Sequence, residues 1–286
     1  MIIKQALKSG AEKLNKFKVK YPSLETEILL SFVLNKSREF LFTHYEKELT
    51  KNQVDKYYRL IAKRTKGEPI AYLVGQKEFY GFDFIVNKNV LIPRPETELI
   101  IDETLNLTIH NPKSTTIVDV GTGSGCIIIT LAKLLNLNYK FIATDISKPA
   151  LSVARQNAKL HGINKRIKFY QGDLLEPIIK QKYSNLIILA NLPYLTPKQI
   201  KKSPTIKHEP KLALSAGKDG LKYYRKLFKK IIKLSFISAT VLCEIDPSQV
   251  KAIRILIKKH FPMSLVKIKK DLSDHNRLVI ISIRDL

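Results

Sequence analysis

The chain has 286 residues, of which 44% are hydrophobic and 26% charged, and its formal net charge is +25. This length allows two domains and a sizeable buried core. No apolar run approaches the roughly 18 residues that cross a membrane, and the first residues lack the apolar stretch of a signal peptide. We therefore exclude a membrane protein and expect a cytoplasmic one.

The positive charge favours binding to polyanions or acidic proteins. Most of the basic residues are lysines scattered along the chain among isoleucines and asparagines. This pattern fits a bias in composition as well as it fits a nucleic-acid groove. A weak contact with RNA or the ribosome is therefore retained as one hypothesis for a partner.

The cysteines and histidines do not predict a metal site. Cys126 and Cys243 stand in apolar contexts, so we expect buried thiols rather than a disulfide or metal ligands. The histidines are dispersed without metal-ligand spacing, and we expect them on the surface. They are His44, His110, His161, His208, His260 and His275.

The first 67 residues have a helical period. Apolar residues mark one face of a helix over 3–14 and of another over 24–33. Thr50 and Gln53 have the spacing of a capping box ahead of a third helix. We predict a small N-terminal helical bundle within residues 1–78, acting as a packing module or as a module that docks the substrate.

Residues 79–98 are expected to form a β-hairpin and a connector loop. Apolar and polar residues alternate over 82–86, and an apolar run resumes at 90–92 after a break, which predicts the two strands of the hairpin. The next segment, Pro93–Glu98, has the character of a stiff loop with Pro95 near a helix start. Taken alone, its charges fit a solvated loop.

Residues 99–286 have the pattern of an α/β domain. From Thr115 onward strands and helices alternate, which predicts a mostly parallel sheet covered on both faces. Helices are expected at 126–134 and 223–234, and a capping box at Asp246 and Gln249. Seven segments are predicted as strands, the last two as an antiparallel pair: 116–120, 141–144, 167–171, 186–190, 240–245, 264–269 and 278–283.

A glycine-rich loop follows the first of these strands. Its three alternate glycines let the backbone turn sharply and let a ligand approach the N–H groups. Dinucleotide-binding enzymes also place such turns here, but the last glycine of G-x-G-x-x-G is missing, which favours a ligand without a pyrophosphate. The loop consists of Gly121, Thr122, Gly123, Ser124 and Gly125.

The next two strand ends carry carboxylates. Asp145 is placed to accept hydrogen bonds from both hydroxyls of a ribose, although it would also suit a helix cap ahead of Ser147. Asp173 is placed to bind an adenine amino group, with Leu174 packed on the ring. Together these positions predict a nucleoside site.

The fourth strand ends in Asn191, Leu192, Pro193 and Tyr194. The Asn191 side-chain oxygen and the Leu192 carbonyl, held extended by the following proline, can both accept hydrogen bonds from one NH2 group. Tyr194 would cover that planar group. A lone tetrapeptide of this kind is more often a simple turn. Four successive strand ends that present ligand groups to one edge favour a site instead.

Together these motifs resemble the class I S-adenosylmethionine-dependent methyltransferases and, more narrowly, the HemK-type peptide chain release factor N5-glutamine methyltransferases. The resemblance spans nearly the whole chain, and Pro93–Glu98 with the Glu209–Pro210 segment is specific to this family. It implies a Rossmann-like methyltransferase sheet. It also implies methyl transfer from S-adenosylmethionine to the glutamine side-chain amide in the Gly-Gly-Gln motif of release factors.

The resemblance also implies roles for residues. On the cofactor side, Gly121–Gly125 hold the methionine end, Asp145 the ribose, and Asp173 with Leu174 the adenine. On the substrate side, Asn191 and the Leu192 carbonyl bind the target NH2. The remaining residues of the predicted substrate site are Pro193, Tyr194, Arg94 and Glu209. The implied partner is a release factor, no metal is implied, and we expect a monomer.

This chain departs from the family pattern at two positions. Leu192 replaces the first proline of Asn-Pro-Pro-Tyr, and His208 stands where an aromatic residue often precedes Glu-Pro. Because the acceptor needed at position 192 is a backbone carbonyl, and Pro193 still favours extended geometry there, we expect the function to survive with some loss of stiffness.

Two other functions fit the residues. An adenine-N6 methyltransferase on RNA or DNA would bind an exocyclic amine of similar geometry, with Tyr194 stacked on a flipped base. The charge of +25 favours it, whereas the absence of a recognisable nucleic-acid module does not. The third hypothesis is a catalytically inactive relic that binds RNA or the ribosome and lost activity when Leu192 arose.

Overall fold

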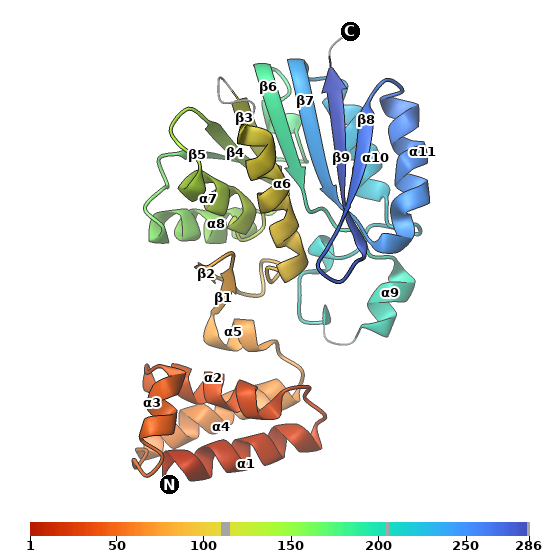
Figure 1. Ribbon diagram of the computed structural model, residues 1–286. Coiled ribbons are helices and arrows are strands. Elements are labelled where there is room, and N and C mark those ends of the chain that lie inside the picture. Colours follow the sequence, from red (N-terminus) through yellow and green to blue (C-terminus); the bar gives the residue numbers. More distant parts are fainter. Residues whose placement is uncertain (110–114, 204–205, 285–286) are drawn as a thin grey trace. The chain divides into compact units, whose positions relative to one another are not determined.

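The computed structural model describes residues 1–109, 115–203 and 206–284 (Figure 1). The chain divides into two compact units, Met1–Gln76 and Lys77–Leu286. We refer to them as the helical unit and the larger unit.

The helical unit confirms the predicted helical period. Tyr57 joins two of its helices, because its buried hydroxyl donates to the carbonyl oxygen of Ala6 at 3.1 Å. Gly10 makes room for this ring, since a Cβ there would lie 1.9 Å from the Tyr57 hydroxyl oxygen. The capping box of Thr50 and Gln53 is present. The helices are α1 (Ile3–Lys16), α2 (Pro22–Leu34), α3 (Arg38–Thr43), α4 (Lys51–Thr65) and α5 (Ile70–Val74).

The predicted β-hairpin exists but was placed wrongly. Its strands are β1 (Gln76–Phe79) and β2 (Phe82–Ile85), and no strand forms at 90–92. The turn lies at Tyr80 and Gly81, whose φ angles of 53° and 75° suit a two-residue hairpin turn.

Side chains bond the backbone at the end of β2 and in the segment that follows it. The amide group of Asn157 bonds both the N–H and the carbonyl of Ile85, at 2.7 and 3.0 Å. The N–H of Ile92 donates to Glu209 at 3.2 Å. Val86, Val90 and Ile92 are thus buried after β2 without entering a sheet.

The larger unit contains the predicted seven-stranded sheet. Its strand order is β5-β4-β3-β6-β7-β9-β8, with parallel pairing from β5 to β7 and antiparallel pairing at β9 and β8. The largest differences from the predicted bounds are in β6 and β7, which start at Lys182 and Ser235 rather than at 186 and 240, because residues outside the apolar runs also pair in the ladder. The strands are β3 (Thr115–Val120), β4 (Lys140–Asp145), β5 (Ile167–Gln171), β6 (Lys182–Ala190), β7 (Ser235–Glu244), β8 (Leu265–Lys270) and β9 (Asn276–Arg284).

The strand order reverses between β3 and β6. From β3 the chain proceeds to β4 and β5 on one side, then returns to β6 and β7 on the other side. Open α/β sheets bind ligands at such a switch point, outside the carboxyl ends of the strands. The residues that follow β3 and β6 are Gly121 and Asn191, so the topology brings two predicted site segments together.

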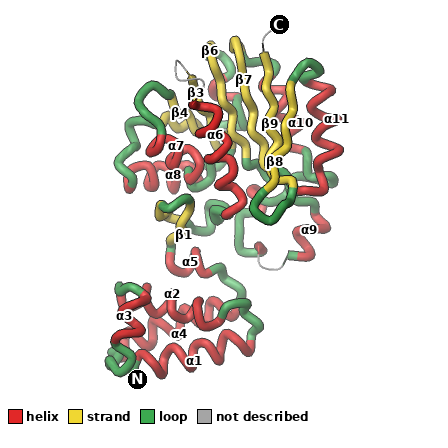
Figure 2. The backbone as a smooth tube through the Cα atoms, in the orientation of Figure 1, coloured by secondary structure: helices red, strands yellow, loops and turns green. Residues whose placement is uncertain are grey.

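Helices cover both faces of the sheet (Figure 2). Alternate strand residues face opposite sides, so Val118 and Ile188 belong to one core cluster, and Ile117 and Ile187 to the other. The first cluster packs on α10 (Lys222–Ile231) and α11 (Val250–His260), and the second on α6 (Glu98–Ile109), α7 (Cys126–Leu134) and α8 (Lys148–Leu160). The short helix α9 (Pro197–Lys202) and the 3-10 turns η1 (Pro95–Thr97) and η5 (Pro247–Gln249) lie in the connections.

Most of the local signals are confirmed. Pro95 begins the turn that leads into α6, and the capping box of Asp246 and Gln249 precedes α11. The helix predicted at 223–234 ends at Ile231. Both cysteines are buried free thiols, as expected.

The prediction that the histidines are surface residues was only partly right. His44 and His275 are exposed, whereas His161, His208 and His260 are partly buried, and His110 lies outside the described residues. Within the described ranges, no group of three or more histidine, cysteine or acidic side chains could hold a metal ion. In the same ranges, no helix combines the length and the apolar character needed to cross a bilayer.

Candidate active site

A cavity of about 220 Å³ lies at the switch point of the larger unit. Its walls come from the loops after β3, β4, β5 and β6, from the connector around Pro93, and from residues 210–213. The predicted site residues that line it are Arg94, Gly121, Thr122, Gly123, Ser124, Asp145, Asp173, Leu174, Asn191, Leu192 and Pro193.

The glycine loop forms a sharp turn on one wall. The N–H groups of Gly121 and Thr122 both donate to the Thr144 carbonyl, at 2.8 and 3.0 Å, which ties the turn to β4. Gly123 has a φ of 56°, and a Cβ there would meet none of the described atoms within 4 Å. The turn therefore leaves open space where a ligand can approach the backbone.

Gly125 lies outside the cavity lining and serves the packing of α7. Its φ is 82°, and a Cβ there would lie 2.8 Å from Ile129 and 3.2 Å from the Ala154 Cβ. The glycine therefore allows α7 to begin close to α8. Its predicted contact with a cofactor stays a prediction.

Asp145 orders the turn at the end of β4. Its carboxylate accepts from the Gly123 N–H at 2.9 Å and from the Ser147 N–H at 2.8 Å. The cap of α8 itself is the Ser147 hydroxyl, which accepts from Ala150 at 3.2 Å. Burial raises the pKa of Asp145, while these N–H donors oppose the shift. The carboxylate thus lines the cavity in a fixed orientation.

The third strand end carries Asp173 and Leu174, which also line the cavity. Leu174 is buried and has a φ of 55°, a left-handed backbone that turns the chain at this point. The Asp173 carboxylate lies 3.1 Å from the Lys230 ammonium and 3.8 Å from that of Lys226. The group predicted to bind an adenine amino group is therefore shared with two lysines of α10.

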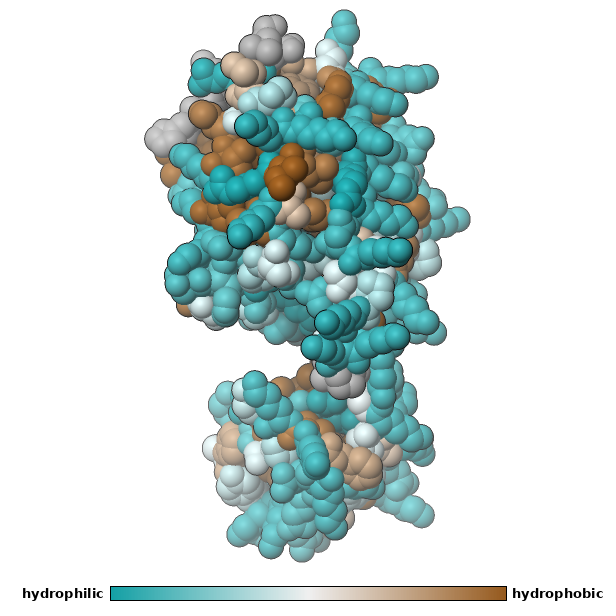
Figure 3. Space-filling view, turned by 90° about the vertical axis from the view of Figure 1, so that its right-hand side faces the viewer, coloured by the Kyte–Doolittle hydropathy of each residue, from teal (hydrophilic) through white to brown (hydrophobic). Residues whose placement is uncertain are grey.

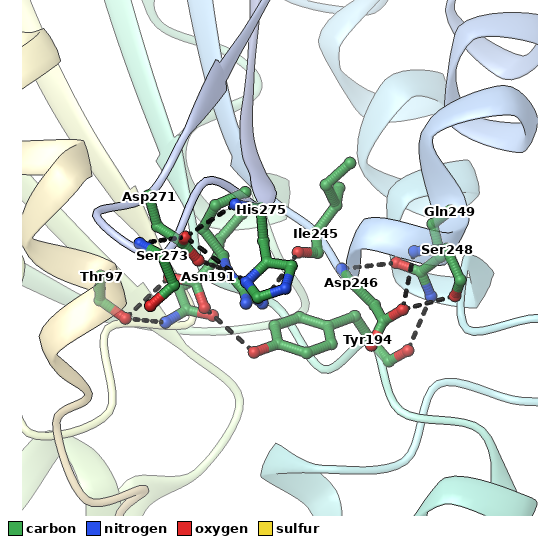
Figure 4. Close-up of polar contacts among 12 residues, drawn as sticks. Thr97, Asn191, Tyr194, Ile245, Asp246, Ser248, Gln249, Asp271, Ser273 and His275 are labelled. Atoms are coloured by element: carbon green, nitrogen blue, oxygen red, sulfur yellow. Dashed lines mark hydrogen bonds and ion pairs between the residues drawn. The ribbon is translucent and has the colours of Figure 1, made fainter.

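Asn191 lies in a chain of side-chain hydrogen bonds (Figure 4). Its Nδ2 donates to the Thr97 hydroxyl at 2.9 Å, and that hydroxyl donates to Glu244 at 2.7 Å. The other carboxylate oxygen of Glu244 accepts from the Tyr194 hydroxyl at 3.1 Å. Tyr194 lies outside the cavity lining, so its predicted role as a cover for the target amide stays a prediction.

The Gln249 side chain joins the backbone at Tyr194 to the segment Asp219–Leu221. The Gln249 side chain donates to the Tyr194 carbonyl at 2.8 Å and to the Asp219 carbonyl at 3.4 Å. A Cβ at Gly220 would lie 2.3 Å from the Tyr194 carbonyl oxygen, so only glycine allows this approach. This contact is a physical reason for the glycine in that segment.

Arg94 and Glu209 form an ion pair, with 2.5 Å between Nη2 and Oε1. Glu209 is buried, and its other oxygen accepts the Ile92 N–H. The pair joins the connector to the segment after position 208. Both of these segments contribute walls of the cavity. Arg94 lines the cavity whereas Glu209 does not, so direct substrate contact by Glu209 stays a prediction.

Three residues near the site were not predicted from the sequence: Asp119, Thr97 and Glu244. Burial raises the pKa of Asp119 to about 7. One of its carboxylate oxygens accepts from Thr122 at 2.6 Å, and the other has no partner among the described residues. A signal for Asp119 existed, because it lies in an apolar strand just before the glycine turn. Thr97 and Glu244 act through partners far away in the chain.

Both parts of the chain match family models. Residues 5–75 match the PrmC N-terminal domain, and residues 111–229 match a methyltransferase domain. Two solved structures of the hMettl16 catalytic domain, in complex with MAT2A 3'UTR hairpins 6 and 1, give TM-scores of 0.56 at 15% and 12% identity. These alignments cover 79% and 89% of this chain and 82% and 90% of the solved chains. At such low identity they show the fold alone.

Curated relatives are more similar in sequence. The release factor glutamine methyltransferases of Dictyoglomus turgidum and Bacillus subtilis are each 37% identical to this chain, covering 90% and 88% of it and 89% and 88% of their own lengths. The bifunctional methyltransferase of Rickettsia felis is 34% identical over 98% of this chain. The chain spans only 58% of the length of that relative.

The match to a methyltransferase domain, together with the sheet order and the cavity at its switch point, identifies a class I methyltransferase domain, and this class implies S-adenosylmethionine as the methyl donor. The identity of 37% over about nine tenths of both chains then defines the family. This chain belongs to the release factor glutamine methyltransferase family.

Proposed function

We propose that this protein methylates the side-chain amide nitrogen of the glutamine in the Gly-Gly-Gln motif of peptide chain release factors, with S-adenosylmethionine as the donor. One observation carries the proposal: a single cavity is lined by the glycine turn, by Asp145 and by Asn191. A donor seated on the first two would therefore face an amide seated on the third.

The cofactor half of the cavity fits S-adenosylmethionine. The open side of the turn at Gly123 suits close approach by the methionine part. In this proposal Asp145 holds the ribose hydroxyls, and Asp173 with Leu174 holds the adenine. When bound, the cofactor supplies an electrophilic methyl group on a sulfonium sulfur.

The amide half of the cavity positions the acceptor nitrogen. In the proposal the Asn191 side-chain oxygen and the Leu192 carbonyl each accept one hydrogen of the target NH2. This arrangement directs the nitrogen lone pair toward the cofactor half. Pro193 and Arg94 also line the cavity, while Tyr194 is bonded to Glu244 and Glu209 is paired with Arg94.

Placement is the main task of the protein in this reaction. An amide nitrogen is a weak nucleophile because its lone pair is delocalised into the carbonyl. Holding two reactants in line can contribute about 7 to 11 kcal/mol. The product nitrogen becomes acidic only as its new bond to carbon forms, so its proton can leave late and no strong general base is required.

Mass spectrometry of a release factor co-expressed with this protein tests the proposal. We expect one added methyl on the glutamine of the Gly-Gly-Gln motif, and none when the cells lack this protein. Labelled methyl on RNA or DNA but not on the release factor would favour the adenine-N6 hypothesis. Failure to bind S-adenosylmethionine in calorimetry would favour the inactive relic.

We further propose that the helical unit Met1–Gln76 docks the release factor. This unit is compact by itself and matches the PrmC N-terminal domain over residues 5–75. The net charge of +25 supports an additional weak contact with RNA or the ribosome. Hydrophilic side chains cover most of the face shown in Figure 3. Binding to RNA or the ribosome should weaken as the salt concentration rises. We also propose that the protein is a monomer, so its mass in solution should be that of one chain.

A further inference from the structure

We infer that Thr97 and Glu244 are positioning residues that determine which way the Asn191 amide faces. The inference rests on the proposed function, because it concerns the group that would bind the target amide. An asparagine side chain has an oxygen and a nitrogen of nearly the same shape. A ligand NH2 requires the oxygen, so rotation of the amide by half a turn would replace an acceptor with a donor.

The direction of the hydrogen bonds selects one orientation. The Thr97 hydroxyl has one hydrogen, and it points to Glu244 at 2.7 Å. The Thr97 oxygen is then left to accept, and it lies 2.9 Å from Asn191 Nδ2. The flipped amide would place its oxygen against this acceptor with no hydrogen between them. The chain of bonds therefore turns the Asn191 oxygen away from Thr97 (Figure 4).

Glu244 is suited to the role of terminal acceptor. It is 1% exposed, and hydroxyl groups donate to both of its oxygens, Thr97 to one and Tyr194 to the other. Burial raises the pKa of Glu244, while the two hydroxyl donors and the positive charge of Arg277 oppose the shift. Arg277 is itself held by Asp271 at 3.0 Å. When ionised, the Glu244 carboxylate can only accept, so it orders both hydroxyl hydrogens.

Tyr224 keeps the two strand ends together. Its buried hydroxyl lies 3.2 Å from the carbonyl oxygen of Ala190, the last residue of β6, and contacts that of Glu244, the last residue of β7. Asn191 follows Ala190 directly. The carboxylate and the amide that it orients are thus attached to neighbouring strands with a fixed spacing.

Thr97→Val removes the hydroxyl and keeps the side-chain shape. We expect kcat for release factor methylation to fall about 10- to 100-fold, while the Kd for S-adenosylmethionine changes less than about twofold. Thr97→Ser restores the hydroxyl and should recover most of kcat. The matched control is Thr104→Val, because among the described residues this buried hydroxyl bonds only to the Ile100 carbonyl in α6, and it should leave kcat unchanged. Equal kcat in Thr97→Val and wild type would overturn the inference.

Glu244→Gln tests the other end of this series of hydrogen bonds. The NH2 group of the introduced side chain can donate to Thr97 and reverse the direction of the bonds. We expect a loss of kcat similar to that of Thr97→Val. A fall in cofactor affinity equal to the fall in kcat, with Thr97→Ser no better than Thr97→Val, would instead indicate general damage and overturn the inference.

A readout that needs no activity separates this inference from the proposed function. In protein whose asparagines carry an isotope label, the NMR signals of the Asn191 NH2 group are those that are absent from the spectrum of Asn191→Ser. Their exchange with water should be roughly tenfold faster in Thr97→Val than in wild type, because one hydrogen bond is lost. Unchanged exchange would overturn the inference. If wild type methylates no release factor but shows this difference, the proposed function fails and the orientation of Asn191 stands.

Discussion

The two halves of the cavity are built in different ways. The proposed cofactor half, at the ends of β3, β4 and β5, uses the backbone of the glycine turn and the Asp145 carboxylate, which already accepts from the N–H groups of Gly123 and Ser147. The amide half, at the ends of β6 and β7, uses side chains that orient one another. The first is a feature of local backbone shape, and the second depends on tertiary contacts.

The hydrogen bonds of the two halves also differ in how far apart their partners lie in the sequence. The bond from Gly123 to Asp145 spans 22 positions, within one strand-helix-strand unit. The bond from Asn191 to Thr97 spans 94 positions, and that from Thr97 to Glu244 spans 147. The comparison predicts that substitutions in one half affect cofactor binding, and substitutions in the other affect the methyl transfer step.

The strongest effect is expected in the amide half. Asn191→Ala removes one of two acceptors for the target NH2 and should raise the barrier to methyl transfer by about 2 to 4 kcal/mol, comparable to the loss of one oxyanion-hole donor. The Kd for S-adenosylmethionine should change little. Single-turnover methylation of release factor, with calorimetry in parallel, measures both. A near wild-type rate would refute the role of Asn191.

The matching substitution in the cofactor half is Asp145→Ala. It removes the acceptor proposed for the ribose and the bonds that order Gly123 and Ser147, so cofactor binding should weaken by about 1.5 to 3 kcal/mol. At saturating cofactor the methylation rate should recover toward wild type. If cofactor affinity were unchanged while the saturated rate collapsed, the division between the halves would be wrong.

A smaller effect, on the stability of the fold, is expected at the ion pair between the connector and the segment after position 208. Arg94→Ala leaves the buried Glu209 carboxylate without its ion pair and should lower the free energy of unfolding by about 2 kcal/mol, less than for a fully buried pair because Arg94 is 35% exposed. Urea titration measures this. The control is Lys269→Ala, whose more exposed pair with Glu103 should contribute about 0.2 to 1 kcal/mol. Equal losses would contradict the assignment.

The last prediction concerns Asp119, which lies next to the proposed cofactor half and should make the stability of the protein depend on pH. The pKa of Asp119 is raised to about 7 by burial, above an unfolded value of about 3.9. Its contribution to stability is therefore fully present below pH 4 and is lost as pH rises through 7, by at most about 1.4 kcal/mol for each pH unit. Asp119→Asn should remove this slope. Parallel pH curves for the two proteins would show that Asp119 does not titrate in this range.

The sequence by itself determined the seven strands, the capping boxes, the glycine turn and the residues at four strand ends. These depend on periodicity and on the backbone preferences of glycine, proline and capping residues, all of which act over a few positions. The hairpin shows how local reasoning fails. The signal at Tyr80 and Gly81 was present, but the apolar run at 90–92 suggested a strand, and only tertiary contacts reveal that Glu209 bonds this segment instead.

Only the tertiary structure decided what surrounds the predicted site residues. The packing of the connections and helices on the sheet brings Thr97 to Asn191 and to Glu244, and Lys230 to Asp173. No local preference marks a buried threonine or glutamate as a partner of an asparagine that is distant in the chain. Such hydrogen bonds form because the topology places these groups in one buried volume, where each polar atom needs a partner.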